Sequence, residues 1–217
     1  MKVKICGITR SKDLALAVKA GADALGFIVG IPSSPRNLTL EKAKKLIKET
    51  PVFIDSVLVA KPKTIKELIK IVEGLKPKTL QIYGNNISTS ELKKIGLPII
   101  KPVKADEKIV FKEAKKACCF NAVLIDSFSL NKLGGTGKPH DWKLSRKIRD
   151  EVYPKPLILA GGLTASNVQK AIKIVKPYGV DVSSGVEAKP GIKDYEKMVE
   201  FIEKAKGLKK WGIRIIL

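Results

Sequence analysis

Short apolar runs alternate with longer amphipathic stretches along the whole chain. The runs are rich in valine, isoleucine and leucine, which favour buried strands. The stretches between them carry apolar residues every three or four positions among lysines and glutamates, as helices that cover a sheet do. We expect strands at Val3–Cys6, Ala24–Val29, Val52–Val59, Thr79–Tyr83, Ile99–Pro102, Ala122–Asp126, Leu157–Ala160 and Val180–Ser183. We expect helices near residues 11–20, 40–49, 64–74, 88–95, 106–118, 142–150, 165–176 and 192–206.

Eight strand-then-helix units can form either a closed parallel barrel or an open doubly wound sheet. The barrel is favoured because unusual residues follow the strands, at the end where barrels place their chemistry. These residues include Cys6, Asp126, Gly162 and Gly185. No Gly-x-Gly-x-x-Gly follows the first strand, which argues against a dinucleotide-binding sheet. We therefore expect a single-domain (β/α)8 TIM barrel over residues 1–208, with residues 209–217 as a short extension packed on the barrel or on a partner chain.

The formal net charge of +21 has two interpretations. A basic surface can bind nucleic acid through its phosphates, or it can be a solvated surface that steers small anionic substrates. The lysines are spread over the predicted helices, without a basic block interleaved with aromatic residues. This distribution favours the solvated surface, so we expect no nucleic-acid partner.

The sequence indicates neither a membrane-spanning segment nor a signal peptide. No apolar stretch approaches the ~18 residues of a membrane span, and the first residues lack the pattern of a signal peptide. We expect no membrane partner and a cytoplasmic location.

The three cysteines include the adjacent pair Cys118 and Cys119, no Cys-x-x-Cys occurs, and there is one histidine. We therefore expect neither a disulfide framework nor a metal site.

Glycine-bearing turns follow the seventh and eighth predicted strands. Gly161 and Gly162 come first, and Ser184 and Gly185 follow the last strand. Glycine lets the backbone approach a bound group closely, and amides at helix N-termini favour anions. The loops after strands seven and eight often form the phosphate site of barrels. Each turn alone could be ordinary, but the two together predict a phosphorylated substrate.

Two candidates for proton transfer stand at strand ends. Cys6 closes the first strand, where it could act as a nucleophile or base, although a buried cysteine is more often a small inert side chain. Asp126 closes the sixth strand and could be a loop cap or a general acid, because partial burial helps a carboxyl to keep its proton. Position alone does not choose between these roles.

Two further charged groups have a predicted environment. Lys4 and Asp181 lie on the first and last strands, which become neighbours if the barrel closes, so we expect them to form an internal ion pair. Arg36 lies in the loop after the second strand. Its guanidinium suits a planar carboxylate, although a lone arginine in a loop is more often a solvent-exposed cation.

Several strings are more specific than these patterns. They are Lys4–Thr9, Gly26–Phe27, Ser34–Arg36, Leu124–Ser127, Gly134–Gly137, Asp141–Trp142, Ala160–Leu163 and Gly179–Glu187. In content and order they resemble the signatures of the phosphoribosylanthranilate isomerases, and they cover the chain from Lys2 to about Leu208.

The resemblance implies a reaction and roles for the matching positions. The family converts N-(5-phosphoribosyl)anthranilate to 1-(2-carboxyphenylamino)-1-deoxyribulose 5-phosphate by an acid/base-catalysed Amadori rearrangement in tryptophan biosynthesis, without a cofactor. Cys6 would be the general base and Asp126 the general acid. The substrate-binding residues would be Arg36 at the anthranilate carboxylate, Gly162, Ser184 and Gly185 at the phosphate, Gly135 in a loop that closes beside it, and Asp181. The only expected partner is this small phosphorylated substrate, and the chain would be a monomer or a homodimer.

The sequence departs from the family pattern at two positions. Tyr83 stands where the family usually has the histidine of Gln-Leu-His-Gly, and Ala60 stands where the asparagine of Val-Phe-Val-Asn is common. The resemblance therefore assigns no role to either residue.

The rival interpretations fit less well. A histidine-pathway aminoaldose isomerase would end strands one and five in aspartates, but here the first ends in Cys6 and the fifth continues into Lys101-Pro102-Val103. A ribulose-phosphate epimerase would need paired histidines around a metal, and the chain has one histidine. A basic nucleic-acid-binding protein remains the alternative from another functional class.

Overall fold

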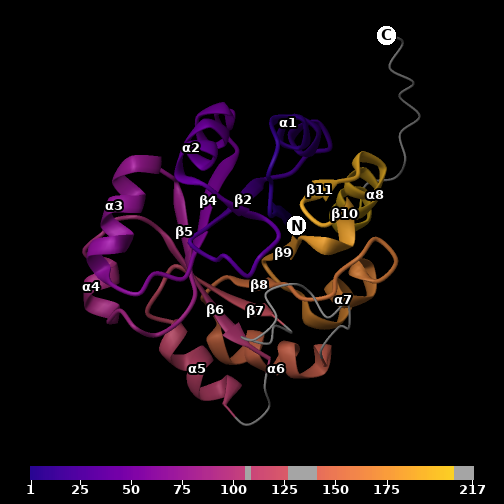
Figure 1. Ribbon diagram of the computed structural model, residues 1–217. Coiled ribbons are helices and arrows are strands. Elements are labelled where there is room, and N and C mark those ends of the chain that lie inside the picture. Colours follow the sequence, from indigo (N-terminus) through magenta and orange to yellow (C-terminus); the bar gives the residue numbers. More distant parts are fainter. Residues whose placement is uncertain (106–108, 127–140, 208–217) are drawn as a thin grey trace.

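Parallel strands close into a barrel in a computed structural model that describes residues 1–105, 109–126 and 141–207 (Figure 1). The barrel strands are β1 (Lys2–Cys6), β2 (Ala24–Val29), β4 (Asp55–Ala60), β5 (Thr79–Ile82), β6 (Ile99–Lys104), β7 (Ala122–Asp126), β8 (Leu157–Leu159) and β9 (Gly179–Val182). Their order is β1-β9-β8-β7-β6-β5-β4-β2, and the pairing of β1 with β2 closes the ring. The expected eight-stranded barrel is confirmed.

Helices follow the strands and surround the barrel (Figure 1). They are α1 (Ser11–Lys19), α2 (Leu40–Glu49), α3 (Ile65–Leu75), α4 (Thr89–Lys93), α5 (Val110–Ala117), α6 (Trp142–Val152), α7 (Val168–Val175) and α8 (Tyr195–Lys206). The side chains of Thr39 and Thr64 accept hydrogen bonds from the amides of Lys42 and Glu67 and so cap α2 and α3. Such caps satisfy amides that have no partner within the helix.

Strand side chains alternate between two apolar layers. On β4, Leu58 joins the outer layer beneath the helices, whereas Val57 and Val59 belong to a smaller cluster that also contains Cys6 and Leu124. The interior of the barrel is therefore filled by side chains, and chemistry is confined to its ends.

Several predicted boundaries are wrong, among them the starts of the third strand and of the eighth helix. The third strand begins at Asp55 rather than Val52, because Val52 and Phe53 lie in a turn and are 77% and 95% exposed. The eighth helix begins at Tyr195 rather than residue 192. Residues Ile192–Lys193 instead form β11, which pairs antiparallel with β10 (Glu187–Lys189). In both places, apolar or charged residues extended the periodic pattern beyond the element.

Smaller elements complete the described part of the chain. The short strand β3 (Asn37–Leu38) pairs with β2, and the 3-10 helix η1 (Ser184–Val186) follows β9. The seventh helix begins at Val168 rather than 165, because residues 164–167 form a turn. In the described ranges, no helix combines the length and apolar character that crossing a bilayer requires.

Three predicted features lie wholly or partly outside the described residues. They are the loop that contains Gly135, the first residues of the predicted helix 106–118, and the extension 209–217.

Candidate active site

Cys6 and Asp126 lie at the same end of the barrel. Each is the last residue of a parallel strand, β1 or β7, and parallel strands present their carboxyl ends together. Cys6 is 7% exposed, whereas Asp126 is partly exposed. The strand next to Cys6 leaves room for its sulfur, because a Cβ at the register partner Gly26 would lie 2.7 Å from Cys6 Sγ.

An ion pair lies inside the barrel next to this end. Lys4 and Asp181 are register partners on β1 and β9, and Lys4 Nζ lies 3.0 Å from Asp181 Oδ2. Lys4 Nζ also donates to Gln81 Oε1 at 2.9 Å. The expected ion pair is therefore present. Asp181 Oδ1 is buried and accepts no hydrogen bond from any described residue.

The same network continues to Tyr83. Gln81 Nε2 donates to the Tyr83 hydroxyl at 3.1 Å. Burial raises the pKa of Tyr83 well above 10, and the charges of Asp126, Cys6 and Asp181 raise it further. The phenol therefore remains protonated at neutral pH among the three candidate residues. The family resemblance assigned no role to Tyr83.

Opposing influences set the pKa of Cys6. Burial raises it and Asp181 adds to this, while the positive charges of Lys4 and Lys193 lower it. The balance lies above the ordinary thiol value, so Cys6 is mostly protonated at neutral pH in the absence of substrate. Burial acts to lower the pKa of Lys4, but Asp181 and Cys6 outweigh it and raise that pKa, so Lys4 remains charged.

Arg36 is buried, with 6% of its surface exposed, and is not the solvated loop cation that a lone arginine more often is. Its guanidinium binds a carboxylate of the protein itself. Nε lies 2.7 Å from Glu187 Oε1, and Nη2 lies 2.5 Å from Glu187 Oε2. The aliphatic part of Arg36 covers Gly7, where a Cβ would collide with Arg36 Cδ.

Lys193 binds the same carboxylate. Its Nζ lies 2.9 Å from Glu187 Oε1 and 3.1 Å from the carbonyl oxygen of Ser183. Sequence reasoning missed Glu187 and Lys193. Glu187 ended the string Gly179–Glu187 but had no assigned role, and Lys193 lay in a stretch predicted as helix. The signal that could have found Glu187 was its charged side chain, which directly follows the glycine-bearing turn.

The two glycine-bearing loops lie against each other. A Cβ at Gly185 would collide with the carbonyl oxygen of Leu163, so the loops after β8 and β9 are in backbone contact. Gly162 has a φ of +65°, and its carbonyl accepts from Asn167 Nδ2 at 2.9 Å. Within the described ranges, no protein group accepts a hydrogen bond from the amides of Gly162, Ser184 or Gly185. These amides are available to an anion.

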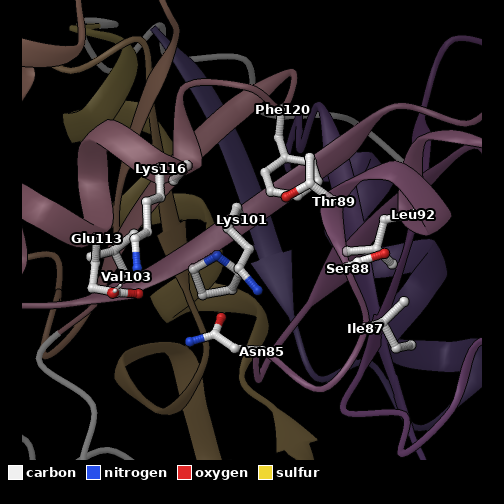
Figure 2. Close-up of a pocket in the computed structure, with 12 residues that line it drawn as sticks. Asn85, Ile87, Ser88, Thr89, Leu92, Lys101, Val103, Glu113, Lys116 and Phe120 are labelled. Atoms are coloured by element: carbon white, nitrogen blue, oxygen red, sulfur yellow. Dashed lines mark ion pairs between the residues drawn. The ribbon is translucent and has the colours of Figure 1, made fainter.

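A separate cavity of about 230 Å³ lies on the outer side of the strands, between α4 and α5 (Figure 2). Figure 2 shows Lys101, Phe120 and the ion-paired residues Glu113 and Lys116 around it. Burial lowers the pKa of Lys101, whose Nζ donates to the carbonyl oxygen of Gly84. No predicted site residue lines this cavity, so it is distinct from the end of the barrel at Cys6.

The structure thus brings Cys6 and Asp181 into one network with Tyr83 and Arg36 close by, and places Asp126 at the same end of the barrel. Gly162, Ser184 and Gly185 form the paired loops beside it, and Gly135 lies outside the described residues. No group of three or more histidine, cysteine, aspartate or glutamate residues suited to a metal occurs in the described ranges.

Known proteins resemble this chain along most of its length. The family model "N-(5'phosphoribosyl)anthranilate (PRA) isomerase" matches residues 3–204. An N-(5'-phosphoribosyl)anthranilate isomerase from Methanosarcina acetivorans is 43% identical, over 94% of this chain and 93% of its own. The crystal structure of phosphoribosyl anthranilate isomerase from Thermotoga maritima has a TM-score of 0.86 at 36% identity, covering 96% of this chain and 100% of that one.

A further solved relative contains a bound ligand. It is a phosphoribosyl anthranilate isomerase in complex with reduced 1-(o-carboxyphenylamino)-1-deoxyribulose 5-phosphate, with a TM-score of 0.82 and 34% identity over 96% of this chain and 100% of that one. The match along nearly the whole chain, together with the barrel and its polar end, shows that this protein belongs to the N-(5'-phosphoribosyl)anthranilate isomerase family, which acts in tryptophan biosynthesis.

Proposed function

We propose that Cys6 is the general base and Asp126 the general acid with which this isomerase rearranges N-(5-phosphoribosyl)anthranilate. The observation that carries the proposal is the placement of a thiol and a carboxyl at the carboxyl ends of β1 and β7. The paired loops with available amides lie at the same end, after β8 and β9.

The reaction then proceeds through two proton transfers. Asp126 gives its proton to the ribose ring oxygen as the bond from that oxygen to C1 breaks, and the nitrogen lone pair forms a C1–N double bond. Cys6, as a thiolate, removes the proton from C2, and the electrons of that bond form a C1–C2 double bond while the nitrogen recovers its pair. The resulting enol loses its hydroxyl proton as C1 gains one, which gives the ketose. Each positioned proton transfer contributes a factor of about 10²–10⁴ in rate.

The cationic intermediate helps the base to act. Burial raises the pKa of the Cys6 thiol in the free protein. A positive iminium formed beside the sulfur favours the thiolate, as any nearby cation does. The substrate therefore assists the ionisation of Cys6 at the step where the thiolate is needed.

Anchors at both ends of the substrate hold the ribose in place. The phosphate binds the amides of Gly162, Ser184 and Gly185, and the anthranilate carboxylate binds Arg36. Asp181 Oδ1, which has no protein partner among the described residues, accepts a hydrogen bond from a sugar hydroxyl. Holding reacting groups in this way replaces an encounter with an intramolecular step.

Turnover of freshly generated substrate, followed by the loss of its fluorescence, tests the two roles. Cys6→Ala and Asp126→Asn each remove most of the turnover while circular dichroism shows an intact fold. Normal turnover in either variant rejects the role of that residue. Adding a chelator to the wild-type assay leaves the rate unchanged if the reaction uses no metal.

The oligomeric state belongs to the same proposal. We infer a homodimer that buries the end of the barrel opposite the site. Phe53 is 95% exposed there, beside a cavity of about 440 Å³ that is also lined by Tyr178 and Pro98. The relative from Thermotoga maritima is described as dimeric. A cytoplasmic location is also proposed, since the phosphorylated substrate is charged and does not cross a bilayer readily.

A further inference from the structure

We propose that Glu187 and Lys193 are positioning residues that hold Arg36 ready for the carboxylate of the substrate, and so determine the preference for a substrate that carries this carboxylate. This inference deepens the proposed function, because it rests on the role given there to Arg36. Neither residue has been assigned a role in the reaction above. Both belong to the hairpin of β10 and β11, which lies beside α8 in Figure 1.

Glu187 occupies one edge of the Arg36 guanidinium and leaves another open. In this side-on pair, the Glu187 carboxylate accepts the N–H of Nε and one N–H of Nη2. A guanidinium has five N–H donors, so three remain, and one each on Nη1 and Nη2 form a second parallel fork. None of the described residues accepts a hydrogen bond from Nη1. A second carboxylate can therefore bind this fork.

The charges of the cluster favour one additional anion. Arg36, Lys193 and Glu187 are all buried, with side chains 7%, 0% and 5% exposed. Burial acts to raise the pKa of Glu187, but Arg36 and Lys193 outweigh it and lower that pKa, so the carboxylate stays charged. Two cations and one anion leave a buried net charge of +1, and a buried charge is unfavourable without a partner. One substrate carboxylate neutralises the cluster.

The hairpin holds this arrangement rigidly. The amide of Lys193 donates to Asp13 Oδ2 at 3.2 Å, and Lys197 Nζ donates to the Glu187 carbonyl oxygen at 2.9 Å. The amide of Gly191 donates to Glu187 Oε1 at 3.3 Å, which fixes the carboxylate within its own turn. Because Glu187 is fixed from several sides, it fixes Arg36 before the substrate arrives, and binding does not have to order the long side chain.

A purely structural network makes a different prediction from a positioning role. If the cluster only stabilises the fold, its loss weakens every ligand equally. If Glu187 acts through Arg36, its loss weakens only ligands that carry the carboxylate. Two ligands separate these cases: reduced 1-(o-carboxyphenylamino)-1-deoxyribulose 5-phosphate and the same compound without its aromatic carboxyl group.

The experiment measures the Kd of both ligands by calorimetry for wild type, Glu187→Gln, Arg36→Met and the double variant. For Glu187→Gln we expect the carboxylate ligand to bind about tenfold more weakly, because the loss of the fixed guanidinium outweighs the attraction of the added positive charge, while the Kd of the carboxyl-free ligand changes less than about twofold. In the Arg36→Met background the same substitution has no further effect on either ligand. Lys193→Met weakens the carboxylate ligand selectively, and Lys193→Arg restores it because the positive charge returns.

Equal weakening of the two ligands overturns the proposal, as does a full effect of Glu187→Gln in the Arg36→Met background. Equal affinity of wild type for the two ligands also overturns it. If Glu187→Gln does not fold, Glu187→Asp replaces it, since it keeps the buried charge but withdraws the carboxylate from the guanidinium. These ligands do not react, so selective binding combined with full turnover by Cys6→Ala would reject the acid–base proposal and leave the role of Glu187 standing.

Discussion

Lys4 on the first barrel strand and Asp181 on the last meet inside the barrel, with Lys4 Nζ 3.0 Å from Asp181 Oδ2. Their side chains are only 5% and 8% exposed. The ion pair therefore joins the two strands that close the ring. It also lies directly beneath Cys6, so one buried pair connects the closure of the barrel with the ionisation of the proposed base.

Replacing Lys4 alone tests how much this ion pair stabilises the fold. Lys4→Met leaves the Asp181 carboxylate buried without a counter-charge, and breaking a buried pair in this way costs about 3–5 kcal/mol of stability. Urea unfolding followed by circular dichroism measures the loss. Lys4→Met combined with Asp181→Leu removes both charges and should recover a large part of it. A loss below about 1 kcal/mol in the single variant would contradict the buried pair.

The ionisation of Cys6 should follow an unusual pH profile. Burial raises the pKa of this thiol, so alkylation by iodoacetamide should reach half its maximal rate above the ordinary thiol value of about 8.5. Lys193→Met should move the midpoint higher, because the charge of Lys193 lowers the pKa of Cys6. The measurement uses a background with Cys118→Ser and Cys119→Ser. A midpoint below about 8 would show that the cations outweigh burial.

Tyr83 should contribute to turnover although the resemblance assigned it no role. Tyr83→Phe removes the hydroxyl that accepts from Gln81 Nε2 and is close enough to Cys6 and Asp126 for their charges to raise its pKa. We expect kcat to fall about tenfold, because Gln81, left without this partner, no longer holds Lys4 in place beside Cys6. Tyr83→His, which restores a polar ring, should retain more activity than Tyr83→Phe. Wild-type kcat in the phenylalanine variant would exclude a role for the hydroxyl.

The contact between the two glycine loops should matter for phosphate. In Gly185→Ala the added methyl group collides with the Leu163 carbonyl oxygen, so the loops must separate and their amides no longer converge. KM for the phosphorylated substrate should rise at least about tenfold. Gly74→Ala is the matched control, since no atom lies within 4 Å of the added Cβ and alanine favours its helix, α3. An unchanged KM in Gly185→Ala would place the phosphate elsewhere.

The proposed homodimer depends on an exposed aromatic side chain. Phe53→Asp places a charge on the surface that the partner would cover, and a desolvated unpaired charge opposes association. Sedimentation should show a dimer for wild type and a monomer for the variant. Thr50→Ser, a mild change nearby, should leave the dimer intact. A wild-type protein that sediments as a monomer at all concentrations would reject the homodimer.

The sequence predicted the barrel because each strand is a compact apolar run and barrel closure brings the first and last strands together. The pairing of Lys4 with Asp181 followed from that closure alone. The partner of Arg36 could not be predicted, since Glu187 lies 151 positions away in sequence. The strands β10 and β11 span only three and two residues, too few to show a period of their own. The surroundings of Arg36 therefore depend on tertiary structure.

The start of the third strand shows a different limit. Val52 and Phe53 continue the apolar run that leads into β4, and nothing in their composition separates them from it. Phe53 has a left-handed backbone conformation, with a φ of +70°, so the extended strand cannot include it. Val52 and Phe53 therefore lie in an exposed turn. An exposed apolar turn can have the same composition as the start of a core strand.

Gly26 and Cys6 share one space. A methyl group at position 26 would lie too close to the Cys6 sulfur. The thiol on the first strand therefore requires glycine at the facing position of the second strand. We therefore expect changes at these two positions to be linked: a bulkier residue fits at position 26 only if the side chain at position 6 becomes smaller or turns away.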